Sequence, residues 1–315
     1  MTLPLKIKLS STALGKGACS LNFYRTVVQG YREPAIPARL VYGIAVHKFI
    51  DTAFKSKGDI KLALTKCEEA FALPKIDDPR SMHLSDLRHL KGVCLNLWMN
   101  YIADDSTFEL LEVGGVPLTE QTFAIPFYKD DYIDVDLCGT LDKIGKFKGG
   151  CYAVGDWKTT SSWDNKGYFQ QFELSRQLLL YLLALKMMHE IAPNSSIGQI
   201  GANKTGAFID AIFLKPDMNE TLVKRSIVYQ KSDEELALFK KSVLTWCINF
   251  SIKIQHHVNV FEPLQKEGIV TGSCEGKWGK CSFWNCCANS DKVAELLLKR
   301  DFKQTDWNPA NYNDL

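Results

Sequence analysis

The sequence predicts an α/β or α+β fold, in which helices come first, a group of strands follows and further helices close the chain. Helices are predicted where apolar residues recur about every 3.6 positions, and strands where apolar and polar residues alternate. The helical segments are 40–54, 59–104, 175–191 and 232–257, and the strand segments are 121–129, 134–144, 152–158 and 207–215. With 315 residues, 46% of them hydrophobic, the chain can form one large core or two smaller ones.

The helical segments differ in what they carry. The first of them, 40–54, contains His47, and Gly43 lies one turn before it, where it leaves room for a close backbone approach. Further on, Ser85 is suited to cap the start of a helix. The segment 175–191 is apolar on most sides, so we expect it to pack against the sheet.

The second half of the chain holds a hairpin and the longest helix. Segments 134–144 and 152–158 are joined by GKFKGG, which predicts a glycine-rich turn between two strands. Ser232 and Glu235 have the spacing of a capping box and predict a helix that reaches about His257. The sequence after that helix shows little periodicity and is rich in cysteine.

Composition narrows the class of protein. Lys and Arg total 38 against 36 for Asp and Glu, a net charge of +2, which excludes a surface coated with basic residues but allows a local positive groove. No apolar run approaches the roughly 18 residues of a membrane span, and the first residues lack the apolar stretch of a signal peptide. We therefore expect a cytoplasmic protein that is not secreted and does not contact membrane. Its ten cysteines are then expected to be free thiols or metal ligands rather than disulfides.

The hairpin carries two acids and a lysine that suit a hydrolytic metal site. Asp156 and Lys158 share one face of their strand, Trp157 points the opposite way into the core, and Asp142 joins the first face across the hairpin. Two nearby carboxylates repel, and a hard cation such as Mg²⁺ removes that conflict by binding both. Lys158 would orient or deprotonate an attacking water, or stabilise charge on a phosphate. This chemistry suits hydrolysis of a phosphodiester.

Four short motifs occur in the order of a known family. They are G-x-A-V-H at 43–47, G-T-L-D at 139–142, G-D-W-K-T-T at 155–160 and Q-L-L-L-Y at 177–181. This series resembles the RecB-like branch of the PD-(D/E)XK nucleases, which includes AddB-type nuclease domains and CRISPR-associated exonucleases. The resemblance implies a restriction-endonuclease-like fold, with a mixed central sheet flanked by helices and a helical insertion.

The resemblance also implies a role for each matching residue. Three side chains and one backbone carbonyl would bind Mg²⁺ or Mn²⁺: His47, Asp142, Asp156 and Trp157. The catalytic residues would be the two acids, the lysine that handles the water, and two polar residues on one face of the following helix: Asp142, Asp156, Lys158, Gln177 and Tyr181. Glu120 and Asp51 are further polar candidates whose roles the sequence leaves open.

A nuclease of this family binds DNA, and some basic and aromatic residues are candidates for that contact. Tyr24, Arg25 and Arg176, together with Tyr181, are expected to follow the strand. Aromatic rings stack on bases, and cationic side chains attract the phosphate backbone.

The cysteines extend the resemblance. A subset of RecB-like nucleases holds a [4Fe–4S] cluster on one cysteine before the nuclease motifs and three near the C-terminus, which here match Cys19, Cys274, Cys281 and Cys287. The match departs from the family at Cys274, because six residues rather than two separate it from Cys281. Cys286 competes with Cys287 for the last position. Zinc, which thiolates also bind, and a set of unligated thiols stay open as alternatives.

The expected function is a divalent-metal-dependent DNA exonuclease that acts on single strands or duplex ends in recombination, repair or replication. The alternative is a catalytically inactive DNA-binding or scaffolding module with a nuclease fold. The family implies a prokaryotic or bacteriophage source, and a separate helicase or recombination protein is a candidate partner. The expected parts are an N-terminal helical part with the first cluster cysteine at 1–54, a helical insertion at 55–118, the nuclease core at 119–216, and a helical, cysteine-rich region at 217–315.

Overall fold

The computed structural model describes most of the chain: residues 3–77, 79–103, 105–161, 167–259, 264, 266–276 and 279–305. The chain forms two compact units, each assembled from separate stretches of sequence. Unit 1 comprises Met1–Pro34, Thr122–Gly139 and Asp233–Leu315, and unit 2 comprises Ala35–Gln121 and Thr140–Ser232.

Backbone pairing links seven strands into a mixed sheet with the order β1-β9-β10-β11-β12, and β5 and β8 also pair with β9. β1 runs parallel to β9 and β10 parallel to β11, whereas β9–β10 and β11–β12 are antiparallel. The strands are β1 (Leu5–Leu9), β5 (Phe108–Leu110), β8 (Thr119–Lys129), β9 (Ile133–Phe147), β10 (Tyr152–Thr160), β11 (Gly206–Phe213) and β12 (Leu222–Arg225). A mixed sheet flanked by helices confirms the predicted fold class.

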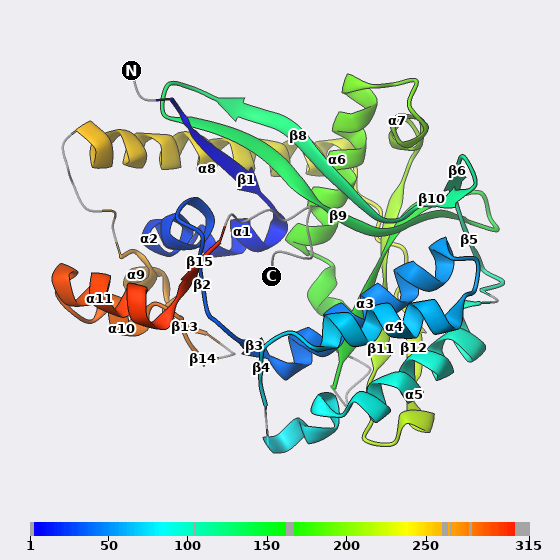
Figure 1. Ribbon diagram of the computed structural model, residues 1–315. Coiled ribbons are helices and arrows are strands. Elements are labelled where there is room, and N and C mark those ends of the chain that lie inside the picture. Colours follow the sequence, from blue (N-terminus) through cyan, green and yellow to red (C-terminus); the bar gives the residue numbers. More distant parts are fainter. Residues whose placement is uncertain are drawn as a thin grey trace. The chain divides into compact units, whose positions relative to one another are not determined.

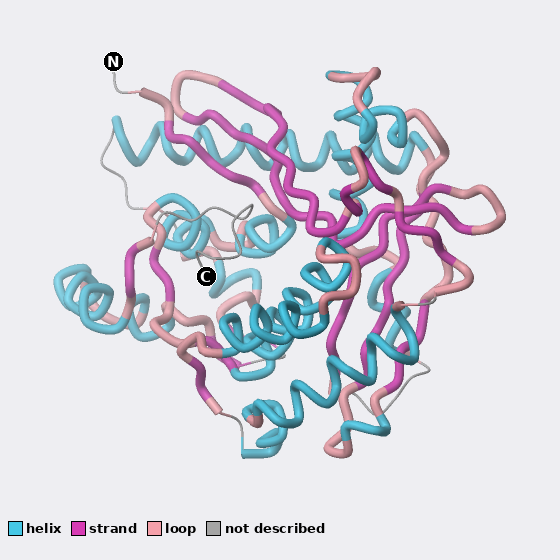
Figure 2. Tube along the Cα trace, turned by 45° about the vertical axis from the view of Figure 1, so that its right-hand side comes forward, coloured by secondary structure: helices cyan, strands magenta, loops and turns pink. Residues whose placement is uncertain are grey.

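In unit 2, residues of three helices and of the strands form one core. Figure 2 shows the helices in cyan and the strands in magenta. Phe49, Leu90 and Trp157 are buried together in this core. The helices of unit 2 are α3 (Ala38–Lys55), α4 (Ile60–Phe71), α5 (Leu87–Leu97), α6 (Arg176–Ile191) and α7 (Ser196–Gly201), with short 3₁₀ or π turns at Pro79–Ser85, Trp98–Ile102, Tyr168–Phe172 and Met218–Glu220. Two strand pairs complete it, β3 (Ile36–Pro37) with β4 (Lys75–Ile76) and β6 (Glu112–Val113) with β7 (Val116–Pro117).

Unit 1 is built around its longest helix, α8 (Asp233–Asn259), which runs beside β1 and β8 in Figure 1. The ring of Phe23 packs edge-on against those of Trp246 and Phe250, with centroids 4.7 and 4.8 Å apart. Its other helices are α1 (Ser11–Lys16), α2 (Ser20–Phe23), a π-helical turn (Tyr24–Val28), α9 (Gly268–Thr271), α10 (Trp284–Cys287) and α11 (Asp291–Asp301). Its short strand pairs are β2 (Tyr31–Arg32) with β15 (Lys303–Gln304) and β13 (Glu275–Gly276) with β14 (Gly279–Lys280).

β1 is a strand that the sequence analysis does not predict. Its five residues, LKIKL, do alternate, and Ile7 and Leu9 are buried while Lys6 and Lys8 are exposed. So short a pattern forms a strand because of its parallel partner β9, which lies more than a hundred residues further along the chain. Across the described ranges, no helix combines the length and the apolar character needed to cross a lipid bilayer.

Candidate metal centre and cysteine pocket

The hairpin of β9 and β10 separates at the point where its two acids lie. Regular pairing ends with Gly155 opposite Lys143. One residue further, an Asp142 carboxylate oxygen accepts the backbone N–H of Trp157 at 2.8 Å, so a side chain takes a bond that the partner strand would otherwise make. Asp142 and Asp156 are consequently neighbours on one side of the hairpin, and both are almost fully buried.

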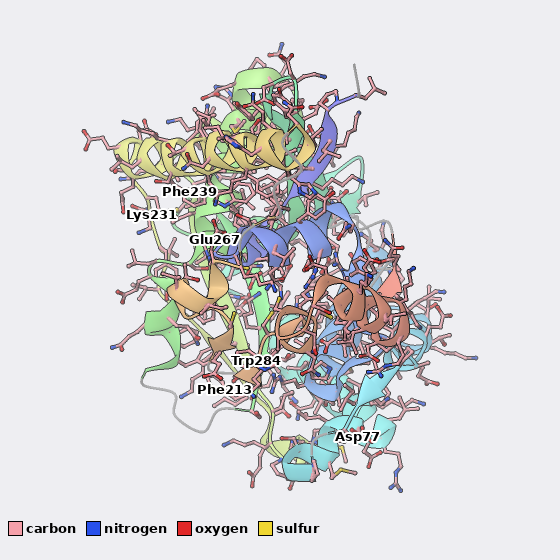
Figure 3. The ribbon with its side chains drawn as sticks, turned by 90° about the vertical axis from the view of Figure 1, so that its left-hand side faces the viewer. Asp77, Phe213, Lys231, Phe239, Glu267 and Trp284 are labelled. Atoms are coloured by element: carbon pink, nitrogen blue, oxygen red, sulfur yellow. The ribbon has the colours of Figure 1, made fainter. Side chains whose placement is uncertain are left out.

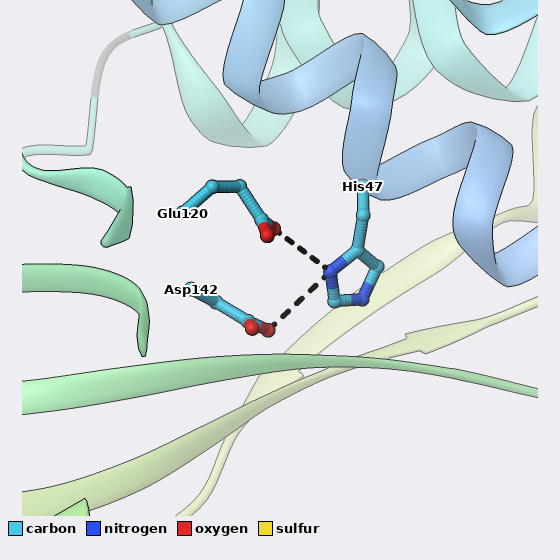
Figure 4. A group of neighbouring side chains, drawn as sticks. All are labelled: His47, Glu120 and Asp142. Atoms are coloured by element: carbon cyan, nitrogen blue, oxygen red, sulfur yellow. Dashed lines mark hydrogen bonds and ion pairs between the residues drawn. The ribbon is translucent and has the colours of Figure 1, made fainter. Parts of the chain in front are cut away.

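Helix α3 brings His47 to this point. A Cβ at Gly43 would lie 3.0 Å from the Thr159 hydroxyl, so the glycine permits the close approach of α3 to β10. His47 Nε2–H donates to the Trp157 carbonyl at 2.9 Å. Its Nδ1 lies 3.3 Å from a carboxylate oxygen of Glu120 and 3.5 Å from one of Asp142 (Figure 4).

Glu120 is the residue of this group whose role the sequence left open. Its φ of +46° is in the left-handed region, which disfavours side chains other than glycine, and it turns the chain at the start of β8. Thr119 beside it donates to Asp51 of α3 at 2.7 Å, and Lys55 pairs with the same Asp51 oxygen at 2.7 Å. Asp51 therefore fixes the start of β8 against α3. Tertiary contacts, rather than a local sequence pattern, place Glu120 beside His47.

Asp156 is held on the other side by a lysine and by α6. Lys158 Nζ lies 2.5 Å from Asp156 Oδ2. Gln177 Nε2 donates to Asp156 Oδ1 at 2.7 Å, and the Tyr181 hydroxyl lies 3.4 Å from the same oxygen. Trp157 points the opposite way and is 5% exposed in the core of unit 2, as the strand alternation predicts.

Burial and mutual charge shift the pKa values of these groups. Burial raises the pKa of Asp142 and raises that of Asp156 to about 6, although Lys158 opposes both shifts. Burial acts to lower the pKa of His47, but Asp142 and Glu120 outweigh it and raise the value to about 9. Burial likewise acts against a charged Lys158, and the two aspartates outweigh it and raise the pKa of Lys158. The buried carboxylates thus favour a cation close to them.

The donor set fits a divalent metal ion. Ligand atoms of His47, Glu120 and Asp142 all lie within 4.8 Å of one another. The second oxygen of Glu120 is buried and accepts no hydrogen bond from any residue that the structure describes. Carboxylate oxygens are the ligands that hard divalent ions prefer, and an imidazole nitrogen is a further donor to divalent metals.

Four cysteines of unit 1 line a cavity. They are Cys19, Cys274, Cys281 and Cys287, and all ten cysteines of the chain are free. The six residues between Cys274 and Cys281 include the paired strands β13 and β14, and the Cys281 N–H donates to the Cys274 carbonyl at 2.8 Å. The long spacing therefore still brings these two cysteines side by side across a hairpin.

A glycine beside the cavity leaves space for its cysteines, and a hydrogen bond links this region to the N-terminal segment. A Cβ at Gly268 would lie 2.8 Å from the Cys274 sulfur and 3.4 Å from Cys19 Cβ, so glycine is needed there. Glu267 accepts the backbone N–H of Ser20 at 2.7 Å, and Trp284 also lines the cavity (Glu267 and Trp284 are labelled in Figure 3).

The adjacent pair Cys286 and Cys287 point in different directions. Cys286 is 2% exposed and packs with Phe283 and Leu298 in a separate apolar cluster, whereas Cys287 faces the cavity. No three of the four cavity sulfurs belong to a set within 4.8 Å of one another among the described residues. A tetrahedral zinc ion, with Zn–S bonds of about 2.3 Å, would bring its sulfurs to within about 4 Å. Among the described residues, the sulfurs around the cavity are therefore not at the spacing of a tetrahedral zinc site.

Two of the residues expected to follow a DNA strand are not available to one. Arg25 is 8% exposed and Tyr181 is 4% exposed. Arg25 instead donates to the Cys287 sulfur, and Tyr181 contacts Asp156. The sequence pattern marks them as polar, but only the packing shows that their polar atoms are used inside the protein.

Comparison with known proteins gives one strong match. The family model described as PD-(D/E)XK nuclease superfamily matches residues 10–288. No curated protein sequence matches the chain. Among solved structures, one described as "Crystal structure of SSO0001" has 15% sequence identity, covers 76% of this chain and 84% of its own, and has a TM-score of 0.26. A TM-score that low supports no conclusion.

Proposed function

The chain belongs to the PD-(D/E)XK nuclease superfamily, and from this premise we propose that it is a divalent-metal-dependent DNA exonuclease with a [4Fe–4S] cluster in its cysteine pocket. The family membership implies a nuclease that uses divalent metal ions. Exonuclease action, the residue roles and the iron–sulfur cluster are the proposal.

The observation that carries the proposal is the convergence of an imidazole, three carboxylates and a lysine within unit 2. They come from α3, β8, β9 and β10, and they are His47, Glu120, Asp142, Asp156 and Lys158. A bound divalent ion supplies Lewis-acid activation of the phosphate and of the attacking water.

The protein's own groups then have separate roles. His47, Asp142, Asp156 and the Trp157 carbonyl hold the metal ion, and Glu120, which the sequence left open, joins them through its oxygen without a hydrogen-bond partner. Lys158 orients the attacking water and stabilises negative charge that develops on the phosphate.

Gln177 and Tyr181 act on the reaction through Asp156. Both contact one Asp156 oxygen, and the Gln177 amide also lies 2.6 Å from the Tyr181 hydroxyl. This arrangement keeps the Asp156 carboxylate in one orientation, which a metal ligand requires.

The cluster proposal is supported by the four thiols around one cavity in unit 1. Cys19, Cys274, Cys281 and Cys287 are the proposed ligands, and two N–H groups donate to their sulfurs. The cluster would supply a structural link between the N-terminal segment and residues 274–287. Zinc is the alternative occupant of the same four thiolates.

Exonuclease action is proposed from the motif order, which resembles RecB-like nucleases that degrade DNA from ends. The test uses the full chain, purified without oxygen, with Mg²⁺ or Mn²⁺ and two substrates of one sequence: linear single-stranded DNA and a closed single-stranded circle. We expect digestion of the linear strand and persistence of the circle. Equal cleavage of both would assign an endonuclease instead.

The matched variants are Lys158→Ala and, in the same hairpin, Lys146→Ala, whose amine lies over the Tyr152 ring away from the acids. Loss of a charge-stabilising group at the reacting phosphate lowers the rate by roughly 10²- to 10³-fold, so Lys158→Ala should be nearly inactive and Lys146→Ala fully active. Full activity of Lys158→Ala would contradict the catalytic role proposed for Lys158. DNA binding without digestion, indifferent to divalent ions, would identify the scaffolding alternative.

A further inference from the structure

The N-terminal segment contributes more to the cysteine pocket than its one thiol, Cys19. Beyond Cys19, the amide of Asn22 donates to the Cys281 sulfur at 3.5 Å and the guanidinium of Arg25 donates to the Cys287 sulfur at 3.4 Å. The three residues are spaced by three positions along α2 and the π-helical turn that follows it, so they share one face. Two donors and one thiol of that face are thus gathered at the same cysteine pocket.

Arg25 is the unusual member of this set. It is 8% exposed, and its guanidinium lies 5.5 Å from the centre of the Phe283 ring. Within the part of the chain that the structure describes, no carboxylate lies within ion-pair distance of it. Arg225 in unit 2, by contrast, pairs with Asp105 and Asp210 at 2.6 and 2.7 Å.

A buried guanidinium needs an anion nearby, because an unpaired buried charge is strongly destabilising. Neutral thiols do not supply that charge. Four thiolates bound to iron or zinc do, since such a group keeps a net negative charge. We propose that Arg25 is the counter-cation of the metal group held by the four cysteines, with Asn22 as a neutral hydrogen-bond donor to it.

This inference rests on the proposed occupancy of the cysteine pocket, and it makes two claims about an occupied pocket. Removing the positive charge of Arg25 weakens metal binding by the four cysteines. If the group is an iron–sulfur cluster, removing the charge also lowers its reduction potential, because the reduced cluster is more negative and loses more stabilisation.

The experiment separates charge from packing with two variants of one residue. Arg25→Lys keeps the charge, and Arg25→Met keeps apolar bulk against Phe283 without it. The control is Arg32→Met, which removes an arginine of the same segment that donates to the carbonyls of Thr26 and Tyr31. The readouts are the rate of metal loss to a chelator, which serves iron and zinc alike, and the midpoint potential by spectroelectrochemistry.

We expect Arg25→Met to lose its metal roughly 10- to 100-fold faster than the wild type, as removal of outer partners of a metal site generally does. Arg25→Lys should stay close to the wild type in both readouts, and Asn22→Ala should differ from it by only a few-fold, the equivalent of about one neutral hydrogen bond. If Arg25→Met does not fold, Arg25→Gln against Arg25→Lys carries the same comparison.

Three outcomes would overturn the inference. One is wild-type behaviour of Arg25→Met, and another is an equal effect of Arg32→Met. The third is a wild-type protein that holds neither iron nor zinc, which would remove the cysteine site as well. Nuclease activity is assayed separately through Lys158→Ala, so a failure here is distinguishable from a failure of the proposed catalytic function.

Discussion

Glu120 shows how much of the site depends on a single backbone angle. With φ at +46°, its side chain turns toward His47, whereas an extended residue at the start of β8 would follow the alternation of the strand. A strained residue of this kind persists because the surrounding contacts impose it, here through Thr119 and Asp51. In the proposed function, the strain and the buried oxygen without a hydrogen-bond donor both serve metal binding.

Two substitutions at Glu120 separate strain from ligation. Glu120→Gln should weaken Mn²⁺ binding roughly 10-fold or more, because a charged oxygen donor is lost. Glu120→Gly should weaken it as much and yet raise the free energy of unfolding by about 1 kcal/mol, since glycine accepts a positive φ without strain. Mn²⁺ titration by electron paramagnetic resonance and urea unfolding measure the two effects.

The control for these variants is Glu109→Gln, at an exposed position on β5. It should leave Mn²⁺ affinity unchanged. If Glu120→Gln bound Mn²⁺ as tightly as the wild type, Glu120 would not be a ligand.

At the scale of single residues, the sequence predicted which side chains lie together where the pattern is local. Asp156, Lys158, Gln177 and Tyr181 lie on two consecutive elements, and regular strand and helix geometry fixes their faces. The direction of the Glu120 side chain could not be predicted from the sequence, because φ at that position depends on contacts from α3. The choice between Cys286 and Cys287 also needed the structure, since a helical turn sends adjacent side chains in different directions.

The central hairpin is held in place by a side chain that crosses it. Lys143 of β9 passes over Gly155 of β10 and pairs with Asp210 of β11, which also pairs with Arg225. The Lys143 amine lies 3.5 Å from the centre of the Trp157 ring, so an aromatic face also receives the buried charge. The residues that follow Lys143 and Gly155 in the pairing are the two acids, so this link fixes the strands that carry them.

Gly155→Ala should therefore damage both stability and activity. A Cβ there would lie 2.4 Å from a Lys143 side-chain carbon and 2.5 Å from the Phe208 ring, and both of these residues are buried. Overpacking of this kind costs about 1–3 kcal/mol, and the shift of β10 should lower the rate of DNA digestion.

Gly149→Ala, in the turn of the same hairpin, is the matched control, because a Cβ there meets no atom within 4 Å. Its free energy of unfolding should stay within about 0.5 kcal/mol of the wild type. Urea unfolding of the three proteins makes the comparison, and equal stability of Gly155→Ala and Gly149→Ala would contradict the role assigned to the Lys143 crossing.

The turn between β8 and β9 is organised by one carboxylate, and this predicts a pH dependence. Asp130 accepts the backbone N–H groups of Tyr132 and Ile133 and the hydroxyls of Tyr128 and Ser251. Burial acts to raise the pKa of Asp130, but these hydrogen bonds outweigh it and hold the pKa below its usual value. A carboxylate with a lowered folded-state pKa stabilises the fold above its unfolded pKa, about 3.9, and that stabilisation is lost as pH falls through the folded value.

Asp130→Ala should thus unfold more easily than the wild type by about 1–3 kcal/mol at pH 7, and the difference should narrow below about pH 4. Asp131→Ala, at the exposed neighbour, should show no such pH-dependent difference. Urea unfolding across this pH range measures both, and a constant difference for Asp130→Ala would show that packing rather than charge is responsible.

For the whole molecule, the sequence predicted the long elements and missed those that distant contacts decide. α3, α6 and α8 are found within a few residues of their predicted bounds, because each repeats its apolar pattern over several turns. β1 and β15 are too short for such a signal and form because β9 and β2 pair with them across long sequence separations. Local sequence patterns likewise cannot predict that the chain divides into two units, each built from separate stretches of sequence.

Unit 1 joins the two ends of the described chain, and the cysteine pocket lies in that junction. β15 pairs with β2, Thr305 donates to the Gly30 carbonyl at 3.0 Å, and Gly30, with φ of +72°, leaves the space that this contact needs. A metal group bound to Cys19 and to three cysteines after residue 270 would stabilise the same junction, since metal binding and folding are coupled at such sites.

The last prediction uses the adjacent cysteines as a matched pair. Cys287→Ser should lose most of the bound metal and lower the melting temperature, and its C-terminal segment after residue 266 should become sensitive to limited proteolysis. Cys286→Ser should keep the metal, because that side chain packs with Phe283 and Leu298 away from the cavity, and should lose only the stability of one buried apolar contact. In both variants the core of α3, α4 and α5 should resist proteolysis, since it draws its residues from unit 2 alone. Metal content, thermal unfolding and mass spectrometry of the fragments give the readout, and a Cys286→Ser protein that loses its metal as fully as Cys287→Ser would reverse the choice of ligand.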